Sequence, residues 1–98
     1  IENIVSNFTQ DALNNNLDGI ICSPKEINII KKLSLNKLLI ITPGIRPDNH
    51  IDSNDDQART MTPKEAIIAG ADYLVIGRPI TQSENPLESI KYINKSIE

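Results

Sequence analysis

The chain alternates between two kinds of apolar segment. Four stretches carry apolar residues at helical spacing, namely residues 2–16, 23–33, 62–70 and 85–97. The shorter runs between them are continuous and rich in branched side chains, and they cover residues 18–22, 37–42 and 72–77. Runs of this kind are typical of strands that are buried on both faces. The alternation of helix and strand therefore predicts a parallel sheet with helical crossovers.

Three of the predicted helices begin with the same arrangement of residues. "SPKE" at 23–26, "TPKE" at 62–65 and "NPLE" at 85–88 each place a capping side chain before a proline and a glutamate. The cap oxygen accepts one free backbone N–H, the glutamate accepts another, and the proline has none to satisfy. Gly70 is expected to be the left-handed residue that ends the second of these helices.

Three βα units cannot close a sheet by themselves, because two strand edges and many apolar side chains would stay exposed. A βα barrel has eight strands and about 250 residues, and three strands and 98 residues are each roughly two-fifths of that. The sequence therefore predicts an α/β fold, the C-terminal portion of a TIM (βα)8 barrel, with residues 1–98 as a single segment without an internal domain boundary. An open doubly wound sheet is the alternative. The start at Ile1, without Met and within a helical pattern, suggests a fragment.

Composition narrows the class of partner and the location. Ten Lys and Arg against thirteen Asp and Glu give a net charge of −3, and there is no basic cluster, which argues against nucleic acid. Cys22 is the sole cysteine, so the chain cannot form its own disulfide, and a reducing compartment is favoured. No apolar run approaches the ~20 residues of a membrane span, and the first residues do not read as a signal peptide. We expect a cytoplasmic protein without a membrane partner.

Candidate chemistry gathers where the predicted strands end, which is where parallel βα folds place their sites. "TPGIRP" follows the second strand, a polar loop over 43–60 ends in "DDQART", and "GRP" follows the third strand. The backbone of Gly77 and Arg78 and the side chains of Arg46, Gln57 and Arg78 could together bind a phosphate dianion, as the last two loops of a barrel commonly do. Each charge-assisted bond contributes about 1.5–3 kcal/mol net.

Each of these motifs also has a simpler explanation. Gly and Pro punctuate any loop, so "GRP" or "TPGIRP" alone is consistent with an ordinary turn. Four aspartates of the loop miss the spacing of a calcium site, so a solvated loop is favoured over a metal site: Asp48, Asp52, Asp55 and Asp56. His50 among them is expected to be exposed, and Cys22 to be a small buried side chain.

Taken together, "ITPGIRP" and "DDQARTMTPKEAIIAGADYLVIGRPIT" resemble the C-terminal part of the orotidine 5′-phosphate decarboxylase family, in its bacterial-type branch. "DGIICSP" and the last helix also match, so the resemblance covers about residues 1–98. Hexulose-phosphate synthases share the strand-Gly-Arg ending but not the combination of these motifs. The resemblance implies decarboxylation of orotidine 5′-phosphate to uridine 5′-phosphate, in de novo pyrimidine biosynthesis, by a homodimer without a metal or an organic cofactor.

The resemblance also implies which residues contact the substrate. Arg46, Gln57, Gly77 and Arg78 match substrate-binding positions, chiefly at the 5′-phosphate, and Pro43 matches a position near the pyrimidine pocket. The stretch from Arg46 to Gln57 is slightly longer than is usual in this branch. The Asp-x-Lys-x-x-Asp pattern that carries catalysis in the family is absent from this sequence. No catalytic residue is therefore assigned here, and the chain alone is expected to be inactive.

Two other functions stay open at this level. The chain could be the phosphate-binding part of another sugar-phosphate barrel enzyme, or a non-catalytic remnant or assembly module. Residues upstream of Ile1 would separate the first alternative from a decarboxylase. An isolated chain that is monomeric and unfolds cooperatively would support the second.

Overall fold

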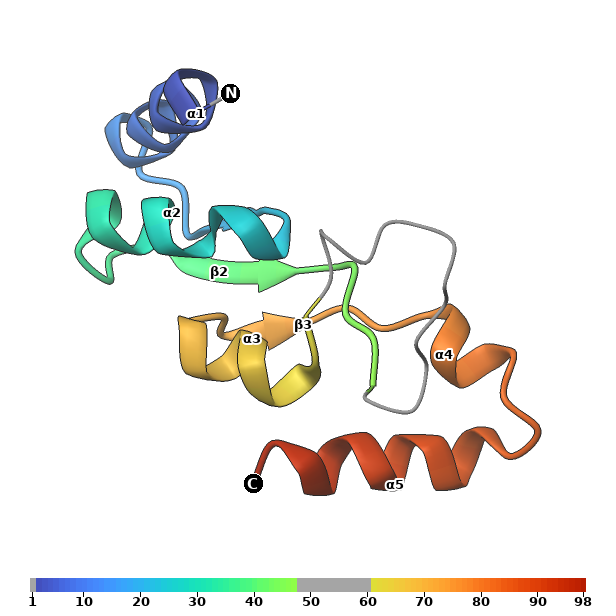
Figure 1. Cartoon of the computed structure of the whole chain (residues 1–98). Helices are drawn as coiled ribbons and strands as arrows, with labels where there is room; N and C mark the ends of the chain where they lie inside the picture. Colours follow the sequence, from blue (N-terminus) through green and yellow to red (C-terminus); the bar gives the residue numbers. More distant parts are fainter. Residues whose placement is uncertain (1, 48–60) are drawn as a thin grey trace.

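The computed structural model describes residues 2–47 and 61–98, which form a short sheet with helices packed against it (Figure 1). In chain order the elements are α1 (Glu2–Asn14), β1 (Gly19–Ile21), the 3-10 turn η1 (Pro24–Glu26), α2 (Ile27–Ser34), β2 (Leu39–Thr42), α3 (Pro63–Ala69), β3 (Tyr73–Leu74), α4 (Arg78–Thr81) and α5 (Pro86–Ser96). Each predicted helix and strand is present. The short helix α4 was not predicted.

The three strands form one parallel sheet in the order β1-β2-β3, as predicted. Their pairing is shorter than the sequence suggests, above all at residues 72–77, where β3 pairs over two residues. The reason lies in β2, which ends beside β3 at Thr42. Pro43 has no N–H to offer, and Gly44 turns the chain with a φ of 76°. After the bond from the Val75 N–H to the Thr42 carbonyl (3.0 Å), the third strand has no further partner in β2.

The start of β3 is fixed by an aspartate. The Asp72 N–H donates to the Ile40 carbonyl (2.8 Å), and the Asp72 carboxylate accepts from the Ile40 N–H (2.9 Å). Both backbone groups of Ile40 on this side are thereby satisfied before the regular ladder begins. The arrangement fixes β3 against the middle of β2.

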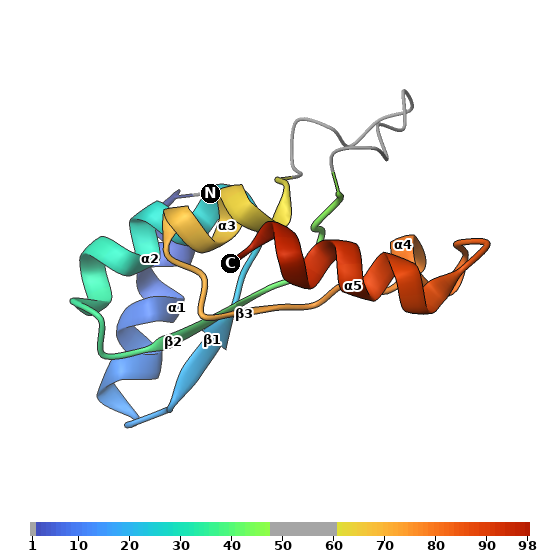
Figure 2. The same ribbon diagram turned by 90° about the horizontal axis from the view of Figure 1, so that it is seen from below.

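The helices cover one face of the sheet and leave the other face open. Figure 2 shows α2, α3 and α5 on the same side of the strands. Side chains on that side form the core: Cys22, Ile27, Ile30, Ile40, Ile45, Ala66 and Ala71. On the opposite side the exposed fractions are 70% for Ile21, 44% for Leu39, 59% for Tyr73 and 52% for Val75. Over the described residues no layer covers this second face, which agrees with the expectation that three βα units alone leave apolar side chains exposed.

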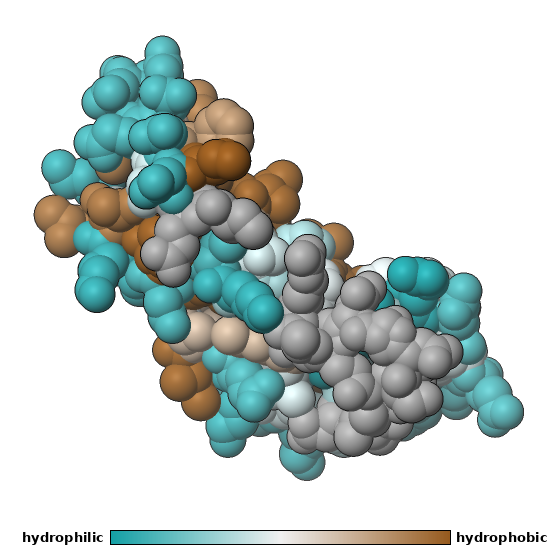
Figure 3. Space-filling view, turned by 45° about the horizontal axis from the view of Figure 1, so that its top comes forward, coloured by the Kyte–Doolittle hydropathy of each residue, from teal (hydrophilic) through white to brown (hydrophobic). Residues whose placement is uncertain are grey.

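Apolar side chains are also exposed on the helical layer. Figure 3 shows hydrophobic and hydrophilic side chains next to each other at the end of the molecule that carries α1. On this helix Ile4 and Phe8 lie one turn apart and are 57% and 63% exposed, whereas Val5 packs against the core. Exposed apolar groups on two faces are more than a small monomeric domain usually tolerates.

The helix starts at Thr62 and Ser23 follow the predicted arrangement to different degrees. At α3 the Glu65 N–H donates to the Thr62 hydroxyl (3.1 Å), and the Thr62 N–H donates to the Glu65 carboxylate (2.9 Å). This is a complete capping box. At η1 the Ser23 N–H donates to the Glu26 carboxylate (3.0 Å), and the Glu26 N–H is taken by the Ser23 carbonyl (3.0 Å).

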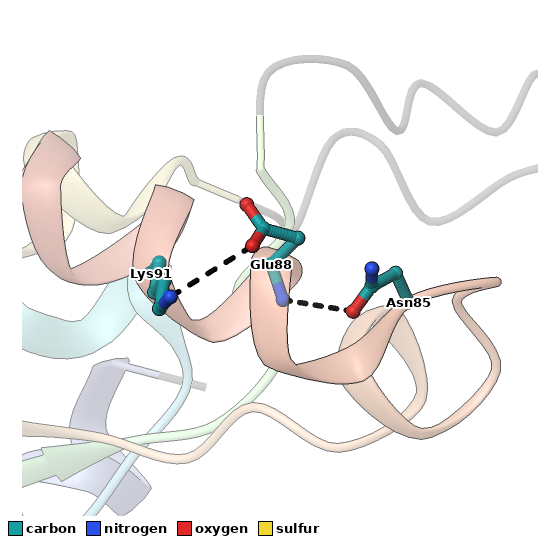
Figure 4. A network of polar contacts seen from close by, with 3 residues as sticks. All are labelled: Asn85, Glu88 and Lys91. Carbon is teal, nitrogen blue, oxygen red and sulfur yellow. Dashed lines mark hydrogen bonds and ion pairs between the residues drawn. The ribbon is translucent and has the colours of Figure 1, made fainter.

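The start of α5 differs from the prediction in one respect (Figure 4). The Glu88 N–H donates to the Asn85 side chain (3.2 Å), as expected for a cap. The Asn85 N–H, however, donates to the Ser83 hydroxyl (3.0 Å), and the Glu88 carboxylate lies 3.8 Å from the Lys91 ammonium. A serine two residues before the cap therefore takes the place that the sequence assigned to the glutamate.

Gly70 ends α3 with a φ of 126°, which confirms the prediction that a residue with positive φ stands here. The space beside it is also filled, because a Cβ on Gly70 would lie 2.8 Å from Cδ of Lys31. The Lys31 ammonium donates to the Gly70 carbonyl over 3.5 Å. A glycine is therefore required both by the backbone conformation and by the packing of α2 against the end of α3.

One buried hydroxyl has no partner, and its removal should stabilise the protein. Ser34, at the end of α2, is buried, and its Oγ forms no hydrogen bond within the part of the chain that the structure describes. Because an unpaired buried polar group costs about 1–3 kcal/mol, we expect Ser34→Ala to raise the midpoint of urea denaturation. The matched change Thr9→Val removes a buried hydroxyl that does donate, to the Val5 carbonyl at 2.8 Å. A stabilisation by Thr9→Val equal to that by Ser34→Ala would contradict this explanation.

Candidate phosphate site

The predicted site residues follow the ends of two neighbouring strands. Thr42 of β2 and Leu74 of β3 are paired, and beyond them the chain leaves the sheet at its carboxyl edge (Figure 1). Arg46 follows β2, and Gly77 and Arg78 follow β3. The structure thus places three of the predicted residues after the carboxyl ends of adjacent parallel strands. Gln57 lies outside the described residues, as do His50 and the four aspartates of the loop.

Gly77 exposes its backbone to solvent, and Arg78 exposes its charged side chain. Both residues are exposed, and nothing within the described residues lies within 4 Å of the position that a Cβ of Gly77 would take. The Gly77 carbonyl accepts from the N–H groups of Ile80 (2.9 Å) and Thr81 (3.0 Å), and Pro79 is buried. The backbone is therefore fixed on its inner side and open on its outer side, so that a ligand can approach it closely.

Arg46 is attached to the rest of the molecule through its neighbours. Ile45 is fully buried in the core and forms an isolated parallel bridge with Met61. The Arg46 N–H donates to the Met61 carbonyl (2.9 Å), and its guanidinium Nη1 donates to the Ile45 carbonyl (3.1 Å). This bridge was not predicted from the sequence. Its signal was Ile45 itself, an apolar residue in a polar loop.

The turns after β1 and β2 lie close together. A Cβ on Gly44 would be 3.8 Å from Cδ of Pro24, at the start of η1. Pro43 is half-buried between the end of β2 and this turn. The carboxyl edge of the sheet is therefore formed by the segments that follow all three strands.

Cys22 directly follows β1, belongs to the core cluster and is buried, as predicted. Its N–H donates to the Ile41 carbonyl (3.0 Å), and its Sγ lies 4.0 Å from the Thr42 hydroxyl. Burial raises the pKa of the thiol, the hydroxyl of Thr42 opposes this in part, and the negative charge of Glu26 adds to it. A raised pKa leaves little thiolate at neutral pH.

We expect Cys22 to be unreactive in the folded protein. Because the raised pKa leaves less thiolate than in a free cysteine of pKa about 8.5, the rate of alkylation should keep rising as pH passes through that value. The measurement is the rate of iodoacetamide modification from pH 7 to 10, in buffer and in urea. A native rate equal to that in urea at each pH would contradict the buried position.

The described residues contain a further cavity, but its chemistry does not suit an anion. It has a volume of about 320 Å³ and lies between β3 and the helices α3, α4 and α5. Its lining is mainly isoleucine and leucine, with Asp72 as its charged member: Ile67, Asp72, Tyr73, Leu74, Ile76, Ile80, Ile90, Ile93, Asn94 and Ile97.

Over residues 2–47 and 61–98 no group of three His, Cys, Asp or Glu side chains could hold a metal ion. In the same ranges no helix is both long and apolar enough to cross a membrane.

Comparison with known families gives one match over nearly the whole chain. Residues 1–93 match the model of the "Orotidine 5′-phosphate decarboxylase / HUMPS family". Among curated proteins, the orotidine 5′-phosphate decarboxylase of Pasteurella multocida (strain Pm70) is 52% identical over 94 residues, which are 95% of this chain and 38% of that protein. The chain therefore spans less than two-fifths of the length of this relative.

Solved structures give the same result for the fold. The orotidine 5′-phosphate decarboxylase of Lactobacillus acidophilus matches with a TM-score of 0.67 and 34% identity, over 84% of this chain and 31% of that one. That of Pyrococcus horikoshii OT3 matches with a TM-score of 0.71 and 28% identity, over 94% and 40%. The parallel order of the strands and these matches confirm the predicted fold class, the C-terminal portion of a TIM barrel.

Proposed function

Since the chain belongs to the orotidine 5′-phosphate decarboxylase / HUMPS family, we propose that it is the C-terminal part of a lyase that converts orotidine 5′-phosphate to uridine 5′-phosphate. Within that enzyme, Arg46, Gly77 and Arg78 bind the 5′-phosphate of the substrate. The observation that carries the proposal is the juxtaposition at the carboxyl edge of the sheet, where an exposed Gly77-Arg78 pair and an anchored Arg46 follow paired strands.

The chemistry of these residues suits a phosphate monoester. Arg46 and Arg78 are planar cations that can each donate two parallel bonds to phosphate oxygens. The uncovered backbone at Gly77 adds a donor that needs no side chain to be ordered. Gln57 completes the set by resemblance, and Pro43 borders the pyrimidine. Cations that bind a remote phosphate lower the barrier when their binding energy is realised in the transition state.

Proton transfer and the loss of carbon dioxide belong to residues outside this chain. The sequence has no Asp-x-Lys-x-x-Asp pattern. We propose that the missing strands supply this cluster, that no metal or organic cofactor takes part, and that the complete enzyme is a homodimer. The substrate is a small molecule, and neither nucleic acid nor a membrane is a partner.

A second function on the same site is a different reaction of a sugar phosphate, because the matching family model also covers HUMPS. The residues that bind the phosphate would be the same, and the catalytic residues outside this chain would differ. Decarboxylation is favoured because the relatives that are about half identical in sequence carry that name. A non-catalytic remnant is disfavoured by the open apolar face of the sheet, which needs the rest of a barrel to cover it.

The test uses a complete barrel, meaning these 98 residues joined to the strands that they lack. We expect it to consume orotidine 5′-phosphate, followed by the change in ultraviolet absorbance, at the same rate before and after dialysis against a chelator. A folded complete barrel that binds uridine 5′-phosphate without turning over the substrate would point to the sugar-phosphate alternative. A barrel that neither binds nor reacts would contradict both.

A further inference from the structure

The two ends of the segment that follows β2 are attached to each other and to the core. Ile45 and Met61 pair as a parallel bridge, and the Arg46 N–H donates to the Met61 carbonyl over 2.9 Å. Met61 is itself partly buried against the core cluster, and the next residue, Thr62, is fixed by the capping box of α3. Arg46 therefore stands on a support that is part of the folded core, although polar sequence surrounds it.

Ile45 is the side chain that ties this support to the core. It is fully buried, in contact with the cluster that contains Ile27, Ile40 and Ala66. Gly44 precedes it with a φ of 76°, so the chain turns sharply out of β2 and then inserts Ile45. Arg46 is the next residue, and its Nη1 donates to the Ile45 carbonyl over 3.1 Å. Ile45 therefore holds Arg46 in two ways: it is the adjacent residue of the backbone, and its carbonyl accepts a hydrogen bond from the guanidinium.

We propose that Ile45, through its bridge to Met61, is a positioning residue that sets the place of the Arg46 guanidinium for a phosphate monoester. This inference rests on the proposed function, in which Arg46 binds the 5′-phosphate. A guanidinium recognises phosphate by parallel bonds in fixed geometry, and a misplacement of about 1 Å can cost on the order of 100-fold. A residue that touches no ligand can therefore control affinity by fixing the base of the arginine.

The test is a double-mutant cycle in the complete barrel, with uridine 5′-phosphate as the probe and uridine as the probe without phosphate. We expect Ile45→Ala to weaken binding of uridine 5′-phosphate by roughly 10-fold or more while leaving uridine unchanged. In an Arg46→Ala background the same change should have little further effect, because the group that it positions is gone. Ile45→Val, which keeps the branched side chain, should restore most of the affinity.

The matched control is Ile27→Ala, which removes the same atoms from an equally buried position in the same cluster. It should lower the denaturation midpoint about as much as Ile45→Ala and leave the affinity for uridine 5′-phosphate unchanged. Equal losses from Ile45→Ala with and without Arg46, or an equal loss of affinity from Ile27→Ala, would overturn the inference while Arg46 keeps its role. Should Ile45→Ala fail to fold, Met61→Ala, at the other side of the bridge, takes its place in the cycle, and additivity with Arg46→Ala would overturn the inference. An Arg46→Ala variant with unchanged affinity would instead remove the proposed function of Arg46, and the inference with it.

Discussion

Replacing Arg78 with alanine in the complete barrel should lower kcat/KM for orotidine 5′-phosphate by roughly 10- to 150-fold or more. The change removes charge-assisted bonds to a dianion, each worth about 1.5–3 kcal/mol. It should leave the fold intact, since the side chain is exposed and the neighbouring Pro79 carries the packing. Steady-state kinetics at constant ionic strength, with circular dichroism of each variant, is the measurement.

Two further variants separate a phosphate contact from a general effect of charge. Lys91→Ala also removes one positive charge, from the exposed side of α5. There the Lys91 ammonium lies 3.8 Å from the Glu88 carboxylate, and both side chains are 65% exposed. It should leave kcat/KM unchanged, because such surface pairs contribute little. Arg78→Lys keeps the charge but loses the planar fork, and its kcat/KM should lie between those of the wild type and Arg78→Ala. Equal kcat/KM for Arg78→Ala and Lys91→Ala would rule out the contact.

The isolated 98-residue chain should show no turnover and should associate in solution. It lacks the catalytic pattern, and one face of its sheet exposes Ile21, Tyr73 and Val75 by more than half. Apolar surface and free strand edges both favour association. Sedimentation velocity at several concentrations and a spectroscopic assay test the two halves of this prediction. A monomer that unfolds cooperatively would contradict the predicted association, and measurable turnover would contradict the predicted inactivity.

The sheet face can be tested apart from the helical layer. Ile21→Thr with Val75→Thr makes two exposed positions of this face polar, one in β1 and one directly after β3, and keeps branched side chains that suit extended backbone. Phe8→Gln makes the outer side of α1 polar instead, where Phe8 is 63% exposed. If the open sheet face drives association, the strand pair of changes should reduce it more than the helix change. The reverse order would place the contact on the helices.

The sequence predicted the architecture well because local signals and connectivity agree. Helical spacing, prolines after capping residues and short branched runs each indicate one element, and crossovers leave a parallel sheet as the natural arrangement. Gly70 is an example of such a local signal, because its position after a helical run predicted the positive φ that it has at the end of α3. The left-handed end of α2 was not predicted, because Leu35 takes a φ of 50° there without being a glycine. Leu35 is 72% exposed, and its N–H donates to the Lys31 carbonyl (3.2 Å), so a local backbone bond and not the burial of its side chain accompanies this conformation.

The candidate site was predicted less completely than the fold. Motif order placed Arg46 and Arg78 after neighbouring strands, since carboxyl ends of parallel strands meet at one edge. The Ile45–Met61 bridge was not predicted, because it joins two single residues sixteen positions apart. An isolated pair of this kind leaves no periodic pattern in the sequence. The length of β3 was overestimated for a similar reason. An apolar run shows that Val75 and Ile76 can form a strand, whereas pairing also requires a partner, and β2 ends at Thr42.

The phosphate grip is tested most directly by comparing two ligands that differ only in the phosphate. Isothermal titration of the complete barrel with uridine 5′-phosphate and with uridine gives a ratio of affinities that isolates this group. We expect a strong preference for the nucleotide in the wild type, and a loss of roughly 100-fold or more of that preference when Arg46 and Arg78 are both replaced by alanine. A preference that survives both substitutions unchanged would show that these residues do not bind the phosphate.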